Sequence, residues 1–252
     1  MTIRIEFLKL KRSPLLRLML IAGIIAPLIK GLQFIAKNEG SVGTWNWFLS
    51  ESQEMFAFCT ITALIVASAV IFSMEYQYGM ASYVFTLPAS RAKIYVAKLA
   101  ALLLMICLMF ASAFLSQLLL GSLLFPEPIS KPMFLKMIWS VLWYIFSYFL
   151  LSIVMVTVPI LTKRFNISAG ILLGYTLITF PIHYYLNNPY INPFLTPATV
   201  AAKIYNTEGY FFGSYYKGVT IDLVGLYLFL VLLAVILFAV GIICFKKTDV
   251  VS

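Results

Sequence analysis

Six long apolar runs dominate this 252-residue chain and limit the folds that it can adopt. Each run can cross a lipid bilayer as a helix, which takes about 20 apolar residues at a rise of about 1.5 Å per residue. Hydrophobic residues make up 62% of the sequence and charged residues only 11%, so lipid must be the solvent for most of the chain. The predicted fold is therefore an all-α integral membrane protein. Its six transmembrane helices are expected at about residues 14–36, 55–74, 99–125, 137–161, 167–186 and 223–245.

The apolar runs use most of the residues, so we expect residues 1–252 to form a single transmembrane domain. The first run follows a basic segment, as a signal peptide would. However, it continues past Pro27 to Ala36 without a small-x-small cleavage site, which favours an uncleaved first span.

The formal net charge of +9 is distributed unevenly along the chain. If the N-terminus lies inside, 12 of the 18 Lys and Arg residues fall in cytosolic segments, and six of the nine acidic residues fall in external ones. This positive-inside asymmetry predicts that both termini are cytosolic. It also explains the basic balance without a nucleic-acid partner.

Residues that could carry chemistry are sparse. The only histidine, His183, is expected at the outer membrane interface, and the three cysteines (Cys59, Cys107 and Cys244) lie in predicted spans without metal-ligand spacing. No glycine-rich phosphate loop followed by Lys-Ser/Thr is present. We therefore expect no catalytic residue, metal or cofactor in this chain, and any ATP hydrolysis on a separate polypeptide.

Two segments outside the spans have more than one interpretation. Residues 2–13 are either a short amphipathic helix in the inner membrane interface or a basic flank that orients the first span. In residues 187–222, Thr196-Pro197 is typical of a helix start. The aromatic residues there form either an interfacial belt or an external gate for amphipathic cargo. They are Tyr190, Phe194, Tyr205, Tyr210, Phe211, Phe212, Tyr215 and Tyr216.

The polar segment from Glu75 to Lys98 is the most informative part of the sequence for function. Glu75 closes the second span, Gly79 follows four residues later, and Pro88 and Ser90 interrupt helical structure. The basic residues of this segment place it in the cytosol. Because this segment is attached to two membrane helices, it could receive force from a soluble partner and pass it to them. The alternative is a basic loop that only sets the orientation of the spans.

This segment, together with the six spans, the N-terminal interfacial helix and the external helical excursion between spans 5 and 6, resembles bacterial ABC transporter permeases of the type-2 exporter superfamily. In size the chain is closest to the small permeases of peptide-antibiotic immunity and export. The resemblance implies two permeases, identical or homologous, paired with two cytosolic ATP-binding subunits that hold ATP and Mg²⁺. It also implies a location in the bacterial inner (cytoplasmic) membrane, among membrane lipids.

The resemblance also assigns residues to contacts. The loop between spans 2 and 3 would be the main coupling helix, and the loop after span 4 a second contact with the ATPase. The expected ATPase-coupling residues are Glu75, Gly79, Thr86, Leu87, Pro88, Ser90, Arg91, Lys163, Arg164, Phe165 and Asn166. Spans 1 and 5 would face the second permease, which assigns Ala22, Ala26, Gly170 and Gly174 to permease–permease packing. The spacing of these four small residues is equally compatible with helix packing within the chain.

We therefore expect a permease subunit of an ATP-driven exporter for hydrophobic or amphipathic cargo such as membrane-active peptides. A membrane scaffold or sensor that recruits a cytosolic partner through the same segment is the alternative. An intramembrane enzyme is disfavoured, because no span carries a recognisable set of catalytic residues. The sequence assigns no residue to the cargo.

Overall fold

The computed structural model describes residues 6–9, 13–36, 44–79, 90–186, 190–197 and 222–247. Within these ranges the long elements are α-helices and no strand is present. They are α2 (Pro14–Ala36), α3 (Trp45–Gln77), α5 (Arg91–Leu124), α6 (Lys131–Thr162), α7 (Phe165–Leu186) and α9 (Leu223–Lys247), with a 3₁₀ turn, η1 (Pro193–Leu195), before α9. All six helices are long and apolar enough to cross a membrane, which confirms the predicted fold class.

Three of the six helices, α2, α7 and α9, begin or end at a predicted residue, and the other three are clearly longer than their predicted spans. α3 begins at Trp45, so the second half of the expected external loop, residues 37–54, is helical. α5 and α6 likewise begin at Arg91 and Lys131. With 33, 34 and 32 residues, these helices are each about 48–51 Å long, more than the roughly 40–45 Å thickness of a bilayer with its headgroups. The predicted spans were too short because they were defined by apolar residues, and the ends of these helices carry polar residues.

Local sequence explains where these helices begin and end. The side chains of Thr44 and Ser90 accept hydrogen bonds from the backbone N–H of Trp47 and Lys93, which caps the first turns of α3 and α5. α6 has a proline in its first turn, where no N–H bond is lost. It ends at Lys163, whose φ of 56° is left-handed and stops the helix.

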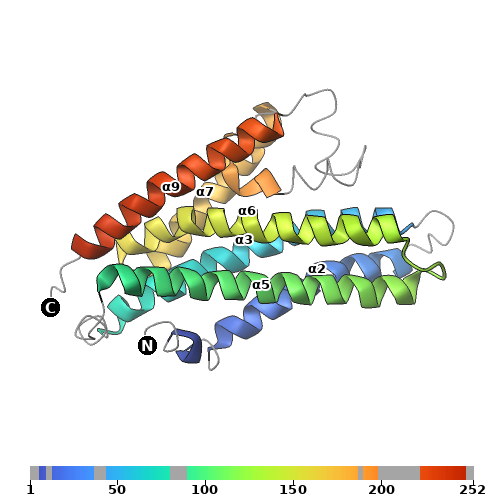
Figure 1. Ribbon diagram of the computed structural model, residues 1–252, viewed down its shortest axis with the longest axis horizontal. Coiled ribbons are helices and arrows are strands. Elements are labelled where there is room, and N and C mark those ends of the chain that lie inside the picture. Colours follow the sequence, from blue (N-terminus) through green and yellow to red (C-terminus); the bar gives the residue numbers. More distant parts are fainter. Residues whose placement is uncertain are drawn as a thin grey trace.

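The helices α2, α3, α5 and α6 run along the long axis of the molecule, and α7 and α9 cross it obliquely on the α6 side (Figure 1). α2 lies against both α3 and α5. α2 and α5 lie close together at Gly23, where an added Cβ would collide with Ser112 Oγ and with the Met109 carbonyl oxygen. Glycine at this position therefore allows the two backbones to meet, as small residues commonly do between membrane helices.

Two apolar clusters fill the bundle, and polar side chains separate them. The larger cluster occupies the middle of the bundle and the end where α3 ends and α5 begins, and the smaller one surrounds Phe125 at the opposite end, called the outer end after the predicted topology. Between them Lys30 pairs with Glu51 at 2.8 Å, and buried amides bond to buried serines. Gln117 Nε2 donates to Ser52 Oγ (2.9 Å), and Gln53 Nε2 donates to Ser140 Oγ (3.1 Å). These contacts join α2, α3, α5 and α6 near their outer ends.

The described part of the external segment contains the 3₁₀ turn η1. Asn192 caps this turn, since its side chain accepts a bond from Phe194 N–H at 3.0 Å and Pro193 follows it. Most of the helix predicted to start at Thr196-Pro197 lies outside the described residues. Phe194 is buried and packs edge-on against Tyr175, so it belongs to the core and not to an interfacial belt. Tyr190 is exposed and packs edge-on against Phe229. The other six aromatic residues lie outside the described residues.

Candidate functional site

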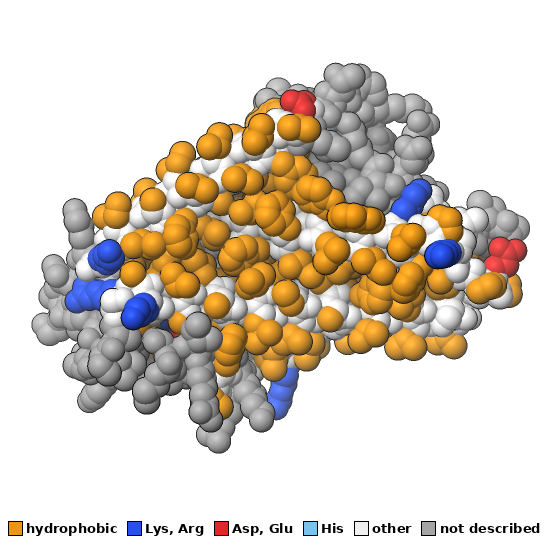
Figure 2. All heavy atoms as spheres, in the orientation of Figure 1, with side chains coloured by type: hydrophobic (Ala, Val, Ile, Leu, Met, Phe, Trp, Pro, Cys, Tyr) orange, Lys and Arg blue, Asp and Glu red, His pale blue; other side chains and the backbone are white. Residues whose placement is uncertain are grey.

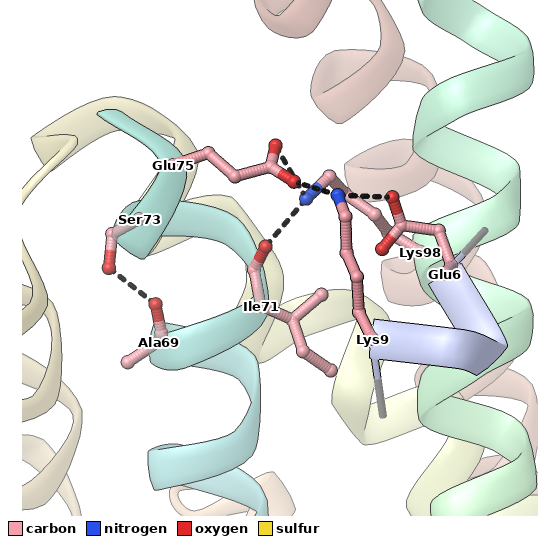
Figure 3. Close-up of polar contacts among 7 residues, drawn as sticks. All are labelled: Glu6, Lys9, Ala69, Ile71, Ser73, Glu75 and Lys98. Carbon is pink, nitrogen blue, oxygen red and sulfur yellow. Dashed lines mark hydrogen bonds and ion pairs between the residues drawn. The ribbon is translucent and has the colours of Figure 1, made fainter. Parts of the chain in front are cut away.

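Glu75, near the C-terminal end of α3, is the centre of a charged cluster at the end of the bundle where α3 ends and α5 begins. Its Oε2 lies 2.9 Å from Lys98 Nζ, and its Oε1 lies 2.8 Å from Lys9 Nζ. Figure 3 shows both lysines pointing at the same carboxylate from different elements. Lys9 also contacts Glu6 Oε1 at 3.2 Å. The four side chains therefore form three ion pairs in a row, Glu6–Lys9, Lys9–Glu75 and Glu75–Lys98.

Lys98 is the most deeply buried member of this cluster, with 2% of its side chain exposed. Besides Glu75, its Nζ donates to the Ile71 carbonyl at 2.7 Å and lies 5.5 Å from the centre of the Phe72 ring. A buried ammonium group is costly unless it is paired and hydrogen-bonded. The sequence suggested a basic residue that sets membrane orientation, but Lys98 instead ties the second turn of α5 to the last turns of α3.

Lys9 is about half exposed, with 48% of its side chain accessible. Burial tends to lower the pKa of Lys9, but the hydrogen bond and charge of Glu75, together with the charge of Glu6, raise that pKa above its ordinary value. Lys9 is therefore protonated at neutral pH. Its stabilising contribution is present below the ordinary lysine pKa and is lost only as the pH rises through the raised value.

The residues that join α3 to α5 are called the α3–α5 segment. Glu75 holds this segment on the α3 side, and a second set of contacts holds it where it leads into α5. Ser90 caps α5, and Arg91 Nη1 donates to the carbonyl oxygen of Lys246 at 2.7 Å. Lys246 is in the last turn of α9, where helix carbonyl groups lack partners within the helix. Arg91 therefore joins the beginning of α5 to the end of α9, and the segment is held at both of its ends. Gly79, at its start, has a φ of +68°, a conformation that favours glycine.

The short connection between α6 and α7 lies beside the same cluster. Lys163 Nζ lies 5.8 Å from the centre of the ring of Tyr76, the residue that follows Glu75 in the sequence. Arg164 and Asn166 are exposed. The structure thus brings the two predicted contact segments to one end of the bundle, although Thr86, Leu87 and Pro88 lie outside the described residues.

The four small residues assigned to permease–permease packing divide into two pairs. Ala22 and Ala26 are buried in the core of this chain, and Ala26 is fully inaccessible. Their assignment to a surface between subunits is wrong, because α2 uses these positions to pack against its own neighbours. Gly170 and Gly174 differ, since a Cβ at either would have no neighbour within 4 Å. That face of α7 is open within the chain.

The comparison with known families decides what this arrangement belongs to. A family model described as an ABC-2 family transporter protein matches residues 2–179. The chain belongs to the ABC-2 transporter family. The matched part contains the Glu75 cluster, both predicted contact segments and α2 to most of α7. No curated protein matches the chain.

Family membership makes this ABC-2 protein a multi-pass membrane permease of an ABC transporter. Such a permease is the transmembrane component and associates with a separate ABC ATPase subunit. Among the described residues, no group of three or more His, Cys, Asp or Glu side chains lies close enough to hold a metal ion. The candidate site of this ABC-2 permease consists of the Glu75 cluster and the two predicted contact segments beside it.

Sequence reasoning singled out Glu75 and Lys98 but did not pair them, and it missed Glu6 and Lys9. The sequence did contain a hint of the first pair. Glu75 lies near the end of one span and Lys98 near the start of the next, so the two opposite charges lie at the same membrane face and can meet there. The Glu6–Lys9 spacing of three is also typical of a pair on one helix face. The meeting of Lys9 with Glu75, 66 residues apart, depends on the tertiary fold.

Proposed function

We propose that this ABC-2 permease is the membrane subunit of an exporter whose ATPase contacts residues 75–91 and 163–166. The observation that carries the proposal is the anchoring of the α3–α5 segment at both ends. Lys98 and Lys9 hold Glu75 on the α3 side, and Arg91 holds the end of α9 on the α5 side. A push on this segment would therefore reach α3, α5 and α9 together.

The proposed topology places this end of the bundle in the cytosol of a bacterial cell, with both termini inside and residues 1–252 as one transmembrane domain. Exposed or half-buried cations gather there, among them Arg91, Lys93, Lys163, Arg164 and Lys246, while Glu6 and Glu75 are internally paired. Figure 2 shows apolar side chains over the middle of the visible face and most Lys and Arg side chains toward its two ends. The apolar middle agrees with a bundle that spans a bilayer, and the cations named above at the Glu75 end support the placement of that end in the cytosol by the positive-inside rule.

Hydrophobic or amphipathic molecules such as membrane-active peptides are the proposed cargo. The exposed faces of α7 and α9 carry large apolar side chains, including Leu177, Ile178, Leu232 and Val235. Residues 165–186 and 223–245 contain no Asp, Glu, Lys or Arg, so these faces offer no side chain of opposite charge to a charged cargo. Export, rather than uptake, follows from the resemblance to small immunity permeases.

A second permease, identical or homologous, is proposed to pack against α7. Gly170 and Gly174 lie one turn apart on a face that the rest of the chain leaves open. Small residues let membrane helices approach closely, so this face suits helix–helix contact. ATP and Mg²⁺ would be held by the ATPase subunits.

The proposal is tested by purifying the permease in lipid with its candidate ATPase, encoded by a neighbouring gene. The readouts are retention of the ATPase and its rate of ATP turnover, for the wild type and for the Glu75→Ala/Arg91→Ala variant. A matched control is Lys93→Ala, which changes an exposed residue of the same turn. We expect the wild type and the control to retain an active ATPase, and the double variant to lose or uncouple its turnover.

Failure of the wild type to capture any ATPase would contradict the exporter. A stable permease without an ATPase would instead favour a scaffold or sensor that recruits another cytosolic partner. Transport of a fluorescent membrane-active peptide into inverted vesicles then tests cargo and direction. Accumulation inside the vesicles that depends on ATP supports export, and loss of peptide from preloaded vesicles contradicts it.

A further inference from the structure

The carboxylate of Glu75 is divided between two lysines that come from separate parts of the chain. Oε2 pairs with Lys98 of α5, whereas Oε1 pairs with Lys9 of the N-terminal helical turn at residues 6–9. Each oxygen has its own ammonium group, as Figure 3 shows. A movement of the end of α3 must therefore carry Lys9 along or break the contact between Oε1 and Lys9.

The N-terminal turn is attached to the bundle by more than this ion pair. Phe7 packs against the large apolar cluster, and the buried Glu6 binds Lys9 from the other side at 3.2 Å. Lys9 thus sits between two carboxylates, one on its own turn and one on α3. The turn is therefore attached at two points, through Phe7 to the apolar cluster and through Lys9 to Glu75 at the end of α3.

The two lysines differ in how firmly they hold Glu75. Lys98 is buried and also bonds to the Ile71 carbonyl, so Glu75 cannot leave it without stranding an ammonium group in an apolar site. Lys9 is about half exposed and can be hydrated when it leaves. The contact between Glu75 and Lys9 is therefore the adjustable one of the two, and it is the ion pair that links the end of α3 to the N-terminal turn.

We propose that the N-terminal turn is part of the element that transmits motion from the ATPase, and that Lys9 is the positioning residue that couples it to Glu75. This inference rests on the proposed function, because it assumes that the ATPase acts on the α3–α5 segment. It goes beyond that function by adding an element outside both predicted contact segments. The turn follows the end of α3 during each cycle of ATP hydrolysis.

The test uses the full permease with its ATPase in lipid and compares Lys9→Met, Lys9→Arg and the control Lys93→Met. Lys9→Met removes the charge but keeps much of the side-chain length, and Lys9→Arg keeps the charge. Hydrogen–deuterium exchange of residues 1–13 and 70–79 reports attachment of the turn. The rate of ATP turnover, with retention of the ATPase measured in parallel, reports transmission.

We expect Lys9→Met to raise exchange in residues 1–13 and to retain the ATPase. Its turnover should change by about two- to fivefold, the size of effect that a half-exposed ion pair supports. Lys9→Arg should restore both readouts, and Lys93→Met should match the wild type. Rescue by arginine separates a role of the charge from a general loss of folding.

Two results would overturn the inference. If exchange in Lys9→Met equals that of the wild type, the turn is not held by Glu75. If exchange rises but turnover stays at the wild-type rate in a complex that retains its ATPase, the turn is attached but transmits nothing. A wild-type protein that captures no ATPase is a different result, since it contradicts the proposed function and with it any transmitting role for Lys9. The exchange measurement still decides attachment in that case.

Discussion

Lys98 Nζ lies 2.9 Å from Glu75 Oε2, and this buried contact fastens the beginning of α5 to the end of α3. The residues that join these two helices include the segment expected to meet the ATPase. The contact therefore fixes the spacing of the two helices on which that segment stands. Its strength can be measured separately from any transport.

Glu75→Ala should destabilise the permease by about 3–5 kcal/mol, because it leaves the Lys98 ammonium group buried with only the Ile71 carbonyl as partner. Lys98→Met should cost less, since Glu75 keeps Lys9 and is partly exposed. The Glu75→Ala/Lys98→Met variant should recover much of the loss. Thermal unfolding of the purified protein measures all three, and strictly additive losses would show that the two side chains do not interact.

Gly23→Ala should lower the stability of the α2–α5 contact by about 1–3 kcal/mol, the usual cost of overpacking a core. The new Cβ would collide with Ser112 Oγ and with the backbone carbonyl of Met109, which cannot move aside easily. Gly31→Ala is the control on the same helix, because its Cβ would meet only Leu124 at an ordinary 3.5 Å. Equal melting temperatures for the two variants would contradict the described approach of α2 and α5.

Ser52→Ala should destabilise the outer end by about 1–3 kcal/mol, because it removes the acceptor of the buried Gln117 amide. Ser52→Ala/Gln117→Leu should be less harmful than Ser52→Ala alone, since no amide then remains without that acceptor. Unfolding in the same detergent compares the two. A larger loss in the double variant would show that the contact contributes little.

Gly170→Phe should weaken association with the second permease without unfolding the chain, because the side chain would project from a face that is open within the monomer. Val235→Phe on the exposed side of α9 is the control. Light scattering of the purified complex measures the number of permeases. A complex that is unchanged by Gly170→Phe, or dissociated equally by both variants, would place the contact elsewhere.

The sequence predicted the spans well where apolar residues alone define a helix. The first span was predicted with the bounds that α2 has, and α9 begins at the predicted residue. The predictions were too short for α3, whose first turns contain Ser50, Glu51 and Gln53. Glu51 and Gln53 are buried against partners from α2 and α6, which the sequence alone does not reveal.

The candidate site was predicted in part. Glu75 and Arg91 were singled out from the sequence, but the partners that hold them, Lys9 and the Lys246 carbonyl, come from the two ends of the chain. Ala22 and Ala26 have the spacing of a subunit contact and yet pack inside the chain. Spacing on one helix shows which residues share a face, but not which neighbour covers that face.

Site-directed crosslinking tests the central claim most directly, namely that the α3–α5 segment and the α6–α7 connection meet the ATPase. Single cysteines replace the exposed residues Tyr78 and Asn166 at the end of the bundle where Glu75 lies, and Ser122 near the opposite end of α5 serves as the control. Our account predicts crosslinks to the ATPase from Tyr78→Cys and Asn166→Cys and none from Ser122→Cys. A complex that retains its ATPase but crosslinks from neither Tyr78→Cys nor Asn166→Cys, or that crosslinks from Ser122→Cys, would contradict it.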